Sequence, residues 1–355
     1  MVAPPIKTRI TRLLKCRYPI ILPGMSWISK PELVAAVSNA GGVGILATGP
    51  LSPKETEESI QRIRQLTDKN FGVGVTLLMP GSKENAEIAL REQVGLINIS
   101  LGKAQWIADE VHSYGGTVLA TVTNRQHAQA ALDAGADAFM VTGYEAAAHG
   151  SEVGNISLIP SFAQSFPDVP IVAAGGFATG SGLSAALTLG ADAIAMGSRF
   201  AVSRESSLSQ AAKDAICSSS EVETIYGSNF DGISARVLKT PISQRLMNKP
   251  PALPIVIWRA LKASRDFSIP LWKVLPGLLT QWDKLFAVAQ FGAATKYLES
   301  ATIHGDLLNG VQFVGQSQGM IHSIEGVDEI VQKIMTDAAN ASTRTASCFS
   351  GGDLE

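Results

Sequence analysis

The sequence has few of the features that mark a secreted, membrane or nucleic-acid-binding protein. Its 355 residues include only three cysteines, which lie far apart at Cys16, Cys217 and Cys348. An odd number of dispersed cysteines builds neither a disulfide framework nor a metal knuckle. The net charge is −2, which argues against general nucleic-acid binding. We therefore expect a protein of a reducing compartment, the cytoplasm.

Long uninterrupted apolar segments are also absent. The apolar stretch 252–279 is broken by Arg259, Lys262, Arg265 and Asp266, so it lacks the roughly 20 apolar residues that cross a bilayer. No apolar segment follows the basic residues near the N-terminus, and we expect no signal peptide. The apolar fraction is nevertheless 46% against 17% charged residues. A large buried core is expected, and disorder is not.

Short apolar segments alternate with amphipathic segments over the first 200 residues. The apolar segments show no polar–apolar alternation, as expected of strands buried on both faces. The pattern Gly-Ala-Asp-Ala precedes a strand and a glycine follows it at both 133–143 and 188–198. Eight successive βα units predict an α/β protein with a closed TIM (β/α)8 barrel; an open doubly wound sheet is the alternative. The predicted strands are 20–23, 43–47, 72–78, 96–100, 117–122, 138–142, 170–173 and 193–196.

Two of the predicted helices begin with a serine that is followed three residues later by a glutamate. Ser29 with Glu32 and Ser52 with Glu55 have the spacing of a capping box, and Pro53 suits the first position of the second helix. Both serines are therefore expected to cap a helix.

The alternating pattern ends near residue 203, and the rest of the chain divides differently. We predict the barrel over 1–229 and a small, mostly helical domain that covers the substrate over 230–319. An amphipathic helix is expected to return to the barrel over 320–339. A Ser/Thr/Gly-rich segment over 340–355 is expected to be a flexible tail.

Glycines end two neighbouring strands, the seventh and the eighth. Gly175 and Gly176 follow the seventh strand, and Gly197 and Ser198 follow the eighth. Bare backbone N–H groups, together with a helix that begins near Gly180, form a site for a phosphate dianion. In barrels of this type phosphate often binds after strands seven and eight. The structural alternative is that these residues make only a tight turn and a helix start.

The other strand ends are poor in reactive side chains. They offer Pro23, Gly24 and Met25 after the first strand and Thr142 and Gly143 after the sixth. No carboxylate pair, metal-ligand cluster or nucleophile with a neighbouring base lies at these predicted ends. A barrel mouth of this kind with a phosphate site indicates that a bound cofactor performs the chemistry. Gly24 would let the backbone approach a planar ring, or it merely ends the strand.

One histidine is expected at the barrel mouth. His149 lies in the segment GYEAAAHG after the sixth strand, whereas His112 and His127 fall on helices predicted to face outward. An imidazole that titrates near neutral pH can accept a proton, so His149 is the candidate catalytic residue. The structural alternative is a hydrogen bond that holds the loop. Glu145 in the same segment either orients the loop or is solvated.

The sequence leaves two roles open for Arg199, and two for the basic segment 236–273. Arg199 either helps to neutralise the phosphate or forms a structural ion pair. The segment 236–273 carries eight basic residues against one acid. It forms either a solvated face or a contact for a phosphorylated ligand, such as a pyridine nucleotide or an acyl thioester.

Several segments resemble the nitronate monooxygenase (2-nitropropane dioxygenase) family. The resemblance implies an FMN-binding barrel in which the two glycine turns hold the flavin phosphate and the turn at 23–25 approaches the isoalloxazine ring. Thr142 and Gly143 are assigned to the same cofactor site, and His149 faces the flavin as the proposed base. The implied reaction oxidises alkyl nitronates or nitroalkanes with O2 to a carbonyl compound and nitrite. The segments that carry the resemblance are 18–49, 71–78, 135–150, 170–180, 190–200 and 315–335.

The same motifs also resemble the FMN-dependent enoyl-acyl-carrier-protein reductases and NAD(P)H:quinone reductases of this superfamily. The PGMSW turn and the LMNK at 246–249 favour the enoyl reductases, and three alanines at 146–148 stand where glycines commonly precede the histidine. The alternative function is therefore an NAD(P)H-dependent FMN reductase of enoyl thioesters or quinones. A flavin-binding protein without turnover is a third hypothesis. The expected partners are a small-molecule substrate, O2 and, for the reductases, NAD(P)H, but no nucleic acid, membrane or metal.

Overall fold

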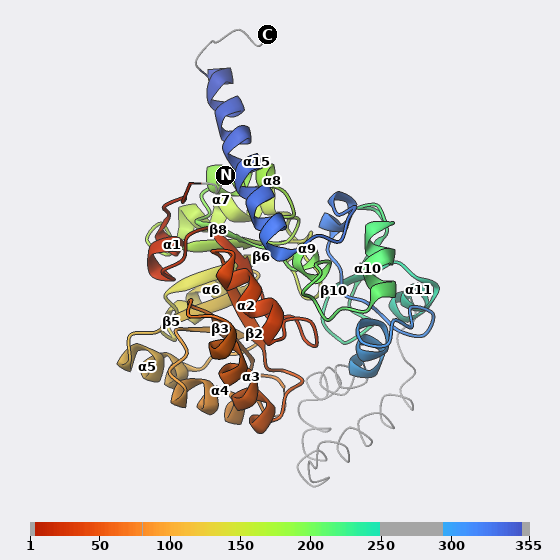
Figure 1. Cartoon of the computed structure of the whole chain (residues 1–355), viewed down its shortest axis with the longest axis horizontal. Helices are drawn as coiled ribbons and strands as arrows, with labels where there is room; N and C mark the ends of the chain where they lie inside the picture. The colour runs from red at the N-terminus through yellow and green to blue at the C-terminus, as the bar shows by residue number, and fades with distance from the viewer. Residues whose placement is uncertain (1–3, 80, 249–293, 350–355) are drawn as a thin grey trace.

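A closed barrel of eight parallel strands forms the main body of the protein (Figure 1). The computed structural model describes residues 4–79, 81–248 and 294–349. The strands follow one another around the ring, and β1 pairs with β8 to close it, which confirms the predicted fold class. The strands are β1 (Ile20–Leu22), β2 (Val43–Ala47), β3 (Gly72–Thr76), β4 (Leu96–Ser100), β5 (Thr117–Val122), β6 (Ala138–Thr142), β7 (Ile171–Ala174) and β8 (Ala193–Ala195).

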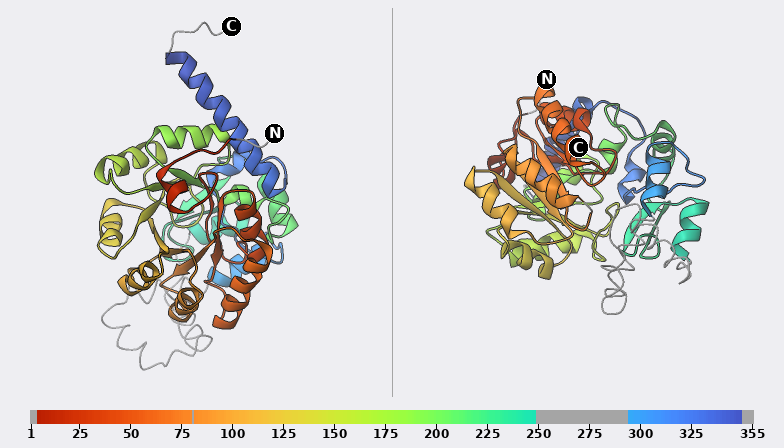
Figure 2. Two further views of the ribbon diagram at one scale, coloured as in Figure 1. Left: turned by 60° about the vertical axis from the view of Figure 1, so that its left-hand side comes forward. Right: turned by 90° about the horizontal axis from the view of Figure 1, so that it is seen from below.

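Each strand is buried on both faces, as its unbroken apolar sequence predicts. In β1, Ile21 packs inside the barrel with Val43 and Ile45. Its neighbours Ile20 and Leu22 pack in the outer apolar layer beneath the helices. The barrel interior is therefore a filled core, and the helices surround it (Figure 2). These helices are α2 (Pro31–Asn39), α3 (Pro53–Leu66), α4 (Ser82–Arg91), α5 (Gln105–Ser113), α6 (Arg125–Leu132), α7 (Asn155–Ser165) and α8 (Gly180–Thr188).

Only one of the two predicted capping boxes forms. The Ser52 hydroxyl accepts a hydrogen bond from the Glu55 backbone N–H, and the Glu55 carboxylate accepts one from the Ser52 N–H. The prediction for Ser29 was wrong, because α2 begins at Pro31 without a side-chain cap. The Ser29 hydroxyl instead accepts from Met25 N–H at 3.0 Å and donates to the Pro23 carbonyl at 2.8 Å. It therefore fixes the turn at the end of β1.

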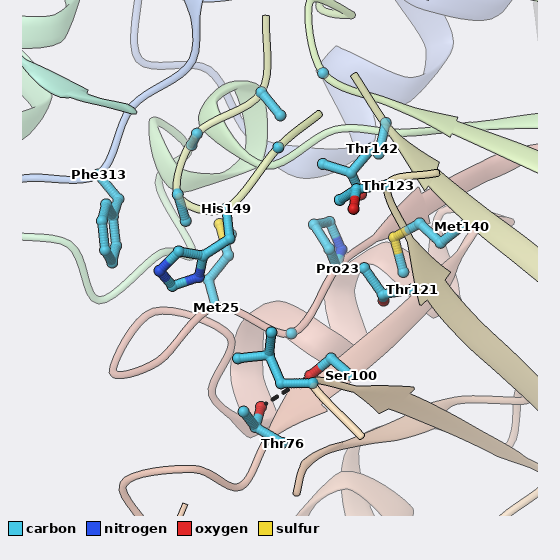
Figure 3. A pocket seen from close by; sticks show the side chains of 18 of the residues that line it. Pro23, Met25, Thr76, Ser100, Thr121, Thr123, Met140, Thr142, His149 and Phe313 are labelled. Carbon is cyan, nitrogen blue, oxygen red and sulfur yellow. Dashed lines mark hydrogen bonds between the residues drawn. The ribbon is translucent and has the colours of Figure 1, made fainter. Parts of the chain in front are cut away.

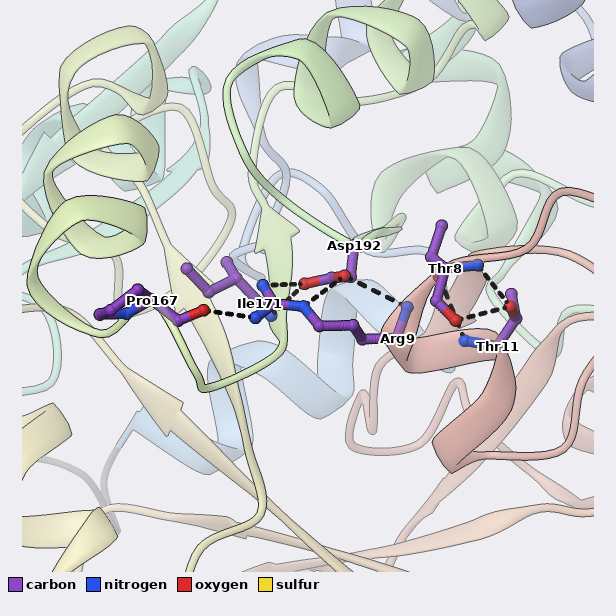
Figure 4. Close-up of polar contacts among 6 residues, drawn as sticks. All are labelled: Thr8, Arg9, Thr11, Pro167, Ile171 and Asp192. Atoms are coloured by element: carbon purple, nitrogen blue, oxygen red, sulfur yellow. Dashed lines mark hydrogen bonds and ion pairs between the residues drawn. The ribbon is translucent and has the colours of Figure 1, made fainter.

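A short helix, α1 (Arg9–Leu13), closes the N-terminal end of the barrel. Its Ile10 joins the apolar interior. Its Arg9 forms a two-pronged ion pair with Asp192, with N–O distances of 2.7 and 2.9 Å, and also donates to the Pro167 carbonyl (Figure 4). Asp192 in turn accepts from the Ile171 N–H. These contacts tie α1 to the starts of β7 and β8 and cover this end of the barrel.

The second part of the chain contains strands as well as helices. A small antiparallel sheet forms from β9 (Thr224–Gly227) and β10 (Ala235–Leu238). These strands pair across the predicted boundary between 229 and 230. Residues 249–293, within the predicted helical domain, lie outside the described residues. The other described elements are α9 (Ser198–Ala201), α10 (Gln210–Cys217), α11 (Pro241–Asn248), helical residues 294–302 and a 3-10 helix, η1 (Gln316–Met320).

The returning helix is α15 (Val327–Phe349), which packs along α8 and then projects from the barrel (Figure 1). A Cβ atom on Gly180 would lie 2.4 Å from the Ile334 carbonyl oxygen, so glycine allows the close approach of the two helices. The helix starts later than predicted and continues to Phe349, so the predicted tail is helical over 340–349. Residues 350–355 lie outside the described residues. No helix in the described part of the chain is long and apolar enough to cross a membrane.

Candidate active site

A cavity of about 1020 Å³ opens at the C-terminal ends of the barrel strands. The ends of β1 and of β3 to β8 form one side. Residues of the small sheet, of the helical segment 294–302 and of 312–317 form the other. Cavities that bind small molecules and cofactors usually measure about 300–1,000 Å³. This cavity is therefore large enough for a cofactor together with a substrate.

Seven of the nine residues predicted to bind a cofactor line this cavity. Gly143 and Gly197 do not. Gly143 lies beneath Asn155, where an added Cβ would come within 2.5 Å of the amide, and Gly197 packs beside Met25. Both glycines therefore lie behind the cavity wall and support it. The seven lining residues are Pro23, Gly24, Met25, Thr142, Gly175, Gly176 and Ser198.

The turn after β7 has the backbone that an anion site requires. Gly175 and Gly176 have φ angles of +98° and +79°, in the left-handed region that favours glycine. The backbone N–H groups of Gly176 and Ser198 meet no acceptor within the described part of the chain. Helix α8 begins at Gly180, as predicted, with Thr179 as its N-cap. Two unpaired donors beside a helix N-terminus suit a phosphate group.

A segment without a predicted role completes this turn. The Ser198 hydroxyl accepts a hydrogen bond from Gly315 N–H at 3.0 Å. Gly315 and Ser317 line the cavity, and the Gln316 N–H donates to the Glu145 carbonyl at 2.9 Å. The sequence signal for this segment was its glycine- and serine-rich composition between two longer elements.

Glu145 is partly exposed, and it orients the loop after β6. Its carboxylate accepts from the Asn155 backbone N–H at 3.0 and 3.1 Å, at the start of α7. The Asn155 amide then donates to the carbonyls of Ala174 and Gly175, at 3.0 and 2.7 Å. The loop after β6 and the turn after β7 are thus held together by one network.

His149 lies in the cavity, on a loop that β10 holds in place. Ala148 exchanges two backbone hydrogen bonds with Arg236, of 3.0 and 3.2 Å. These bonds hold Ala148 at a φ of +52°, a conformation that costs a non-glycine residue about 1–2 kcal/mol. The anchored backbone places the His149 ring between Phe313 and the strand ends (Figure 3). The two rings meet edge to face, with centroids 5.9 Å apart.

The His149 ring also contacts a carboxylate that sequence reasoning missed. Its Nε2 lies 2.8 Å from Oδ2 of Asp231, a side chain with no exposed surface. The other carboxylate oxygen, Oδ1, accepts from the Ile233 N–H at 3.2 Å. Asp231 belongs to the loop between β9 and β10, far from His149 in sequence.

Two arginines have structural roles. Arg236 is 2% exposed and lies over the rings of Tyr144 and Tyr226, at 4.5 and 5.3 Å, so it does not belong to a solvated face. Lys239 and Arg245 of the same segment are exposed, as a solvated face predicts. The basic residues between 249 and 273 lie outside the described residues. Arg199 does not line the cavity; it lies 3.5 Å from Glu325 and donates to backbone carbonyls. Burial lowers the pKa of Arg199, and the structural ion pair is confirmed.

Polar side chains line the wall formed by β3 to β6. The hydroxyls of Thr76 and Ser100 lie 3.1 Å apart (Figure 3). The Asn98 amide donates to Thr121 at 3.0 Å. His127 reaches the edge of this wall and lines the cavity, so the prediction that it faces outward was wrong. The first turn of α6 therefore lies at the mouth of the cavity.

The chain matches the nitronate monooxygenase family over residues 7–105 and 84–337. It belongs to this family. It is therefore an enzyme of the flavin-dependent oxidoreductase type.

Relatives in other species carry more than one activity name. A Rhodococcus jostii protein named (3aS,4S,5R,7aS)-5-hydroxy-7a-methyl-1-oxo-octahydro-1H-indene-4-carboxyl-CoA dehydrogenase is 30% identical over 94% of this chain and 96% of its own length. A probable nitronate monooxygenase of Staphylococcus aureus is 30% identical over 65% of this chain and 78% of its own. FabK from Thermotoga maritima is 31% identical, with a TM-score of 0.79 over 98% of this chain and 99% of its own.

Proposed function

We propose that the protein is an FMN-dependent oxidoreductase of acyl thioesters, which interconverts a saturated acyl group and its α,β-unsaturated form. The observation that carries the proposal is the cavity of about 1020 Å³ that contains both the glycine turn and His149. A small nitroalkane would fill only a minor part of this space beside a mononucleotide. The similarity to a CoA dehydrogenase along nearly the whole chain supports the larger substrate.

The residues around the turn after β7 fit a flavin mononucleotide. Gly175, Gly176 and Ser198 would hold the phosphate through their backbone N–H groups, and the turn from Pro23 to Met25 would lie against the ring system. No dinucleotide-binding fingerprint follows the first strand, so FMN fits better than FAD. When bound, FMN supplies the acceptor or donor of the electrons.

His149 exchanges the proton in this reaction. Its ring lines the cavity, and the proton is taken from or returned to the carbon beside the thioester carbonyl. Loss of this proton as the β-carbon loses a hydride leaves a carbon–carbon double bond, and the reverse steps restore the saturated chain. An imidazole can both accept and donate a proton near neutral pH.

Nitronate oxidation is the second candidate, and the match to the nitronate monooxygenase family supports it. The carbon beside a nitro group is acidic for the same reason as the carbon beside a thioester carbonyl. His149 could therefore act as the base in either reaction, with O2 as the final oxidant in the second.

Anaerobic spectroscopy of the flavin tests the two candidates. The protein would be photoreduced and mixed with 2-octenoyl-CoA, with saturated octanoyl-CoA as the matched control. Return of the flavin absorbance with the unsaturated thioester alone is the expected result. In a parallel sample, propyl-2-nitronate would be added to the oxidised protein. Bleaching by the nitronate, with no response to the thioester, would replace the first proposal by the second.

A further inference from the structure

We infer that Asp231 is a positioning residue for His149, whose carboxylate keeps the ring in the tautomer with a proton on Nε2. In that tautomer Nδ1 carries the lone pair, so Nδ1 is the atom that takes up or releases the substrate proton. The inference rests on the proposed role of His149 in proton exchange.

The geometry around the carboxylate supports this role. An ionised carboxylate only accepts hydrogen bonds, and Asp231 Oδ2 lies 2.8 Å from His149 Nε2. With the carboxylate ionised, the donor in this contact is the ring nitrogen. The Ile233 N–H holds the other oxygen, Oδ1, so the carboxylate cannot rotate without losing a second bond. Phe313 meets the ring at an interplanar angle of 67° and restricts its rotation.

The position of Asp231 separates it from the other ionisable groups near the ring. Glu152 lies on the same loop as His149 and Tyr226 lies in β9; both line the cavity, and Glu152 is exposed. Lys103 lines it from the loop after β4, and His127 lines it from the first turn of α6. Asp231 alone of these groups has no exposed surface. Its hydrogen bond therefore does not compete with water, and a charged partner strengthens such a bond.

The same hairpin supplies both the support and the carboxylate. Strand β10 binds the backbone of Ala148 through Arg236, and the loop that precedes β10 carries Asp231. The small sheet is thus part of the proton-transfer site. A barrel that lacked it would keep His149 but lose the group that orients the ring.

The tautomer of His149 can be measured without any substrate. The protein contains five histidines, so ¹⁵N-histidine labelling and long-range ¹H–¹⁵N spectra give few signals, and His149→Gln assigns the one of interest. At a pH where the ring is neutral, we expect a protonated Nε2 in the wild type. In Asp231→Asn the side-chain amide can donate to Nε2, and we expect the signal of the other tautomer to appear. Asp109→Asn, at an exposed position on α5 that does not line the cavity, is the matched control and should leave the spectrum unchanged.

Activity provides the second measurement. Asp231→Asn should slow turnover of the thioester by about 10²- to 10⁴-fold, the usual contribution of positioned proton transfer, while Asp109→Asn should change it little. Retention of bound flavin by Asp231→Asn would show that the variant folds. A wild-type ring with its proton on Nδ1 would overturn the inference, even if the variant did not fold. Failure of every thioester and nitronate to react would instead overturn the proposed function and leave the tautomer result standing.

Discussion

Replacing Gly176 by alanine tests the phosphate site most directly. The residue has a φ of +79°, and an added Cβ would lie 3.2 Å from Cβ of Glu145. An alanine in this conformation costs about 1–2 kcal/mol, and relaxation of the turn would move the backbone N–H away from the ligand. A hydrogen bond to a charged group contributes about 1.5–3 kcal/mol. Because 1.4 kcal/mol is a factor of ten, FMN affinity should fall about ten- to a hundredfold.

Gly115→Ala is the matched control for this substitution. Gly115 has a φ of +77°, and no atom would lie within 4 Å of an added Cβ. An alanine at position 115 would therefore have the same backbone strain, but Gly115 does not line the cavity. Titration of apo-protein with FMN, followed by flavin fluorescence, gives the affinity, and chemical denaturation gives the stability. If Gly176→Ala lost as much stability as Gly115→Ala but bound FMN like the wild type, the turn after β7 would not be the phosphate site.

Three further substitutions address other parts of the site. Ser198→Asp should weaken FMN binding, by an effect worth about 1–3 kcal/mol, because it places a carboxylate beside the phosphate dianion; unchanged affinity in the same titration would contradict this. His149→Ala should slow steady-state turnover of neutral nitroalkanes by about 10²- to 10⁴-fold and of preformed nitronates much less, and equal losses would remove the assignment as a base. Arg236→Lys should lower the free energy of unfolding by about 1–3 kcal/mol, because the guanidinium bonds to the Tyr144 carbonyl and to Thr224 are lost; urea denaturation that matches the wild type would argue against this role.

The barrel could be predicted because its signals are local. Four strands, β2, β4, β5 and β6, have the predicted bounds, since apolar runs between turn residues define them. The prediction failed where backbone groups outside the helix competed for the same side chain. Ser29 had the spacing of a helix cap, but its hydroxyl bonds to Met25 and Pro23 instead. A spacing rule cannot register that competition, because it depends on how the turn after β1 folds.

The candidate site could be predicted only in part, because some of its contacts depend on the tertiary fold and not on local sequence. The glycine turns could be recognised, since an Ala-Gly-Gly segment after an apolar strand is typical of a tight turn with positive φ angles. Asp231 could not, because Asp-Gly at 231–232 is typical of an exposed turn. Its burial comes from the pairing of β9 with β10 and from the packing of that hairpin over the barrel mouth. Neither depends on the residues next to it in sequence.

The hairpin explains why this barrel mouth, poor in reactive side chains, can still support proton transfer. A histidine on a flexible loop samples several orientations, and each rotatable bond that must be fixed during the reaction raises the barrier. Here the loop backbone is bonded to β10 and the ring is bonded to Asp231, so both are fixed before a ligand arrives. The strand ends supply the walls and the anion site, and the hairpin supplies the orientation. Substitutions in the hairpin should therefore affect turnover more than flavin affinity, whereas substitutions after β7 should do the reverse.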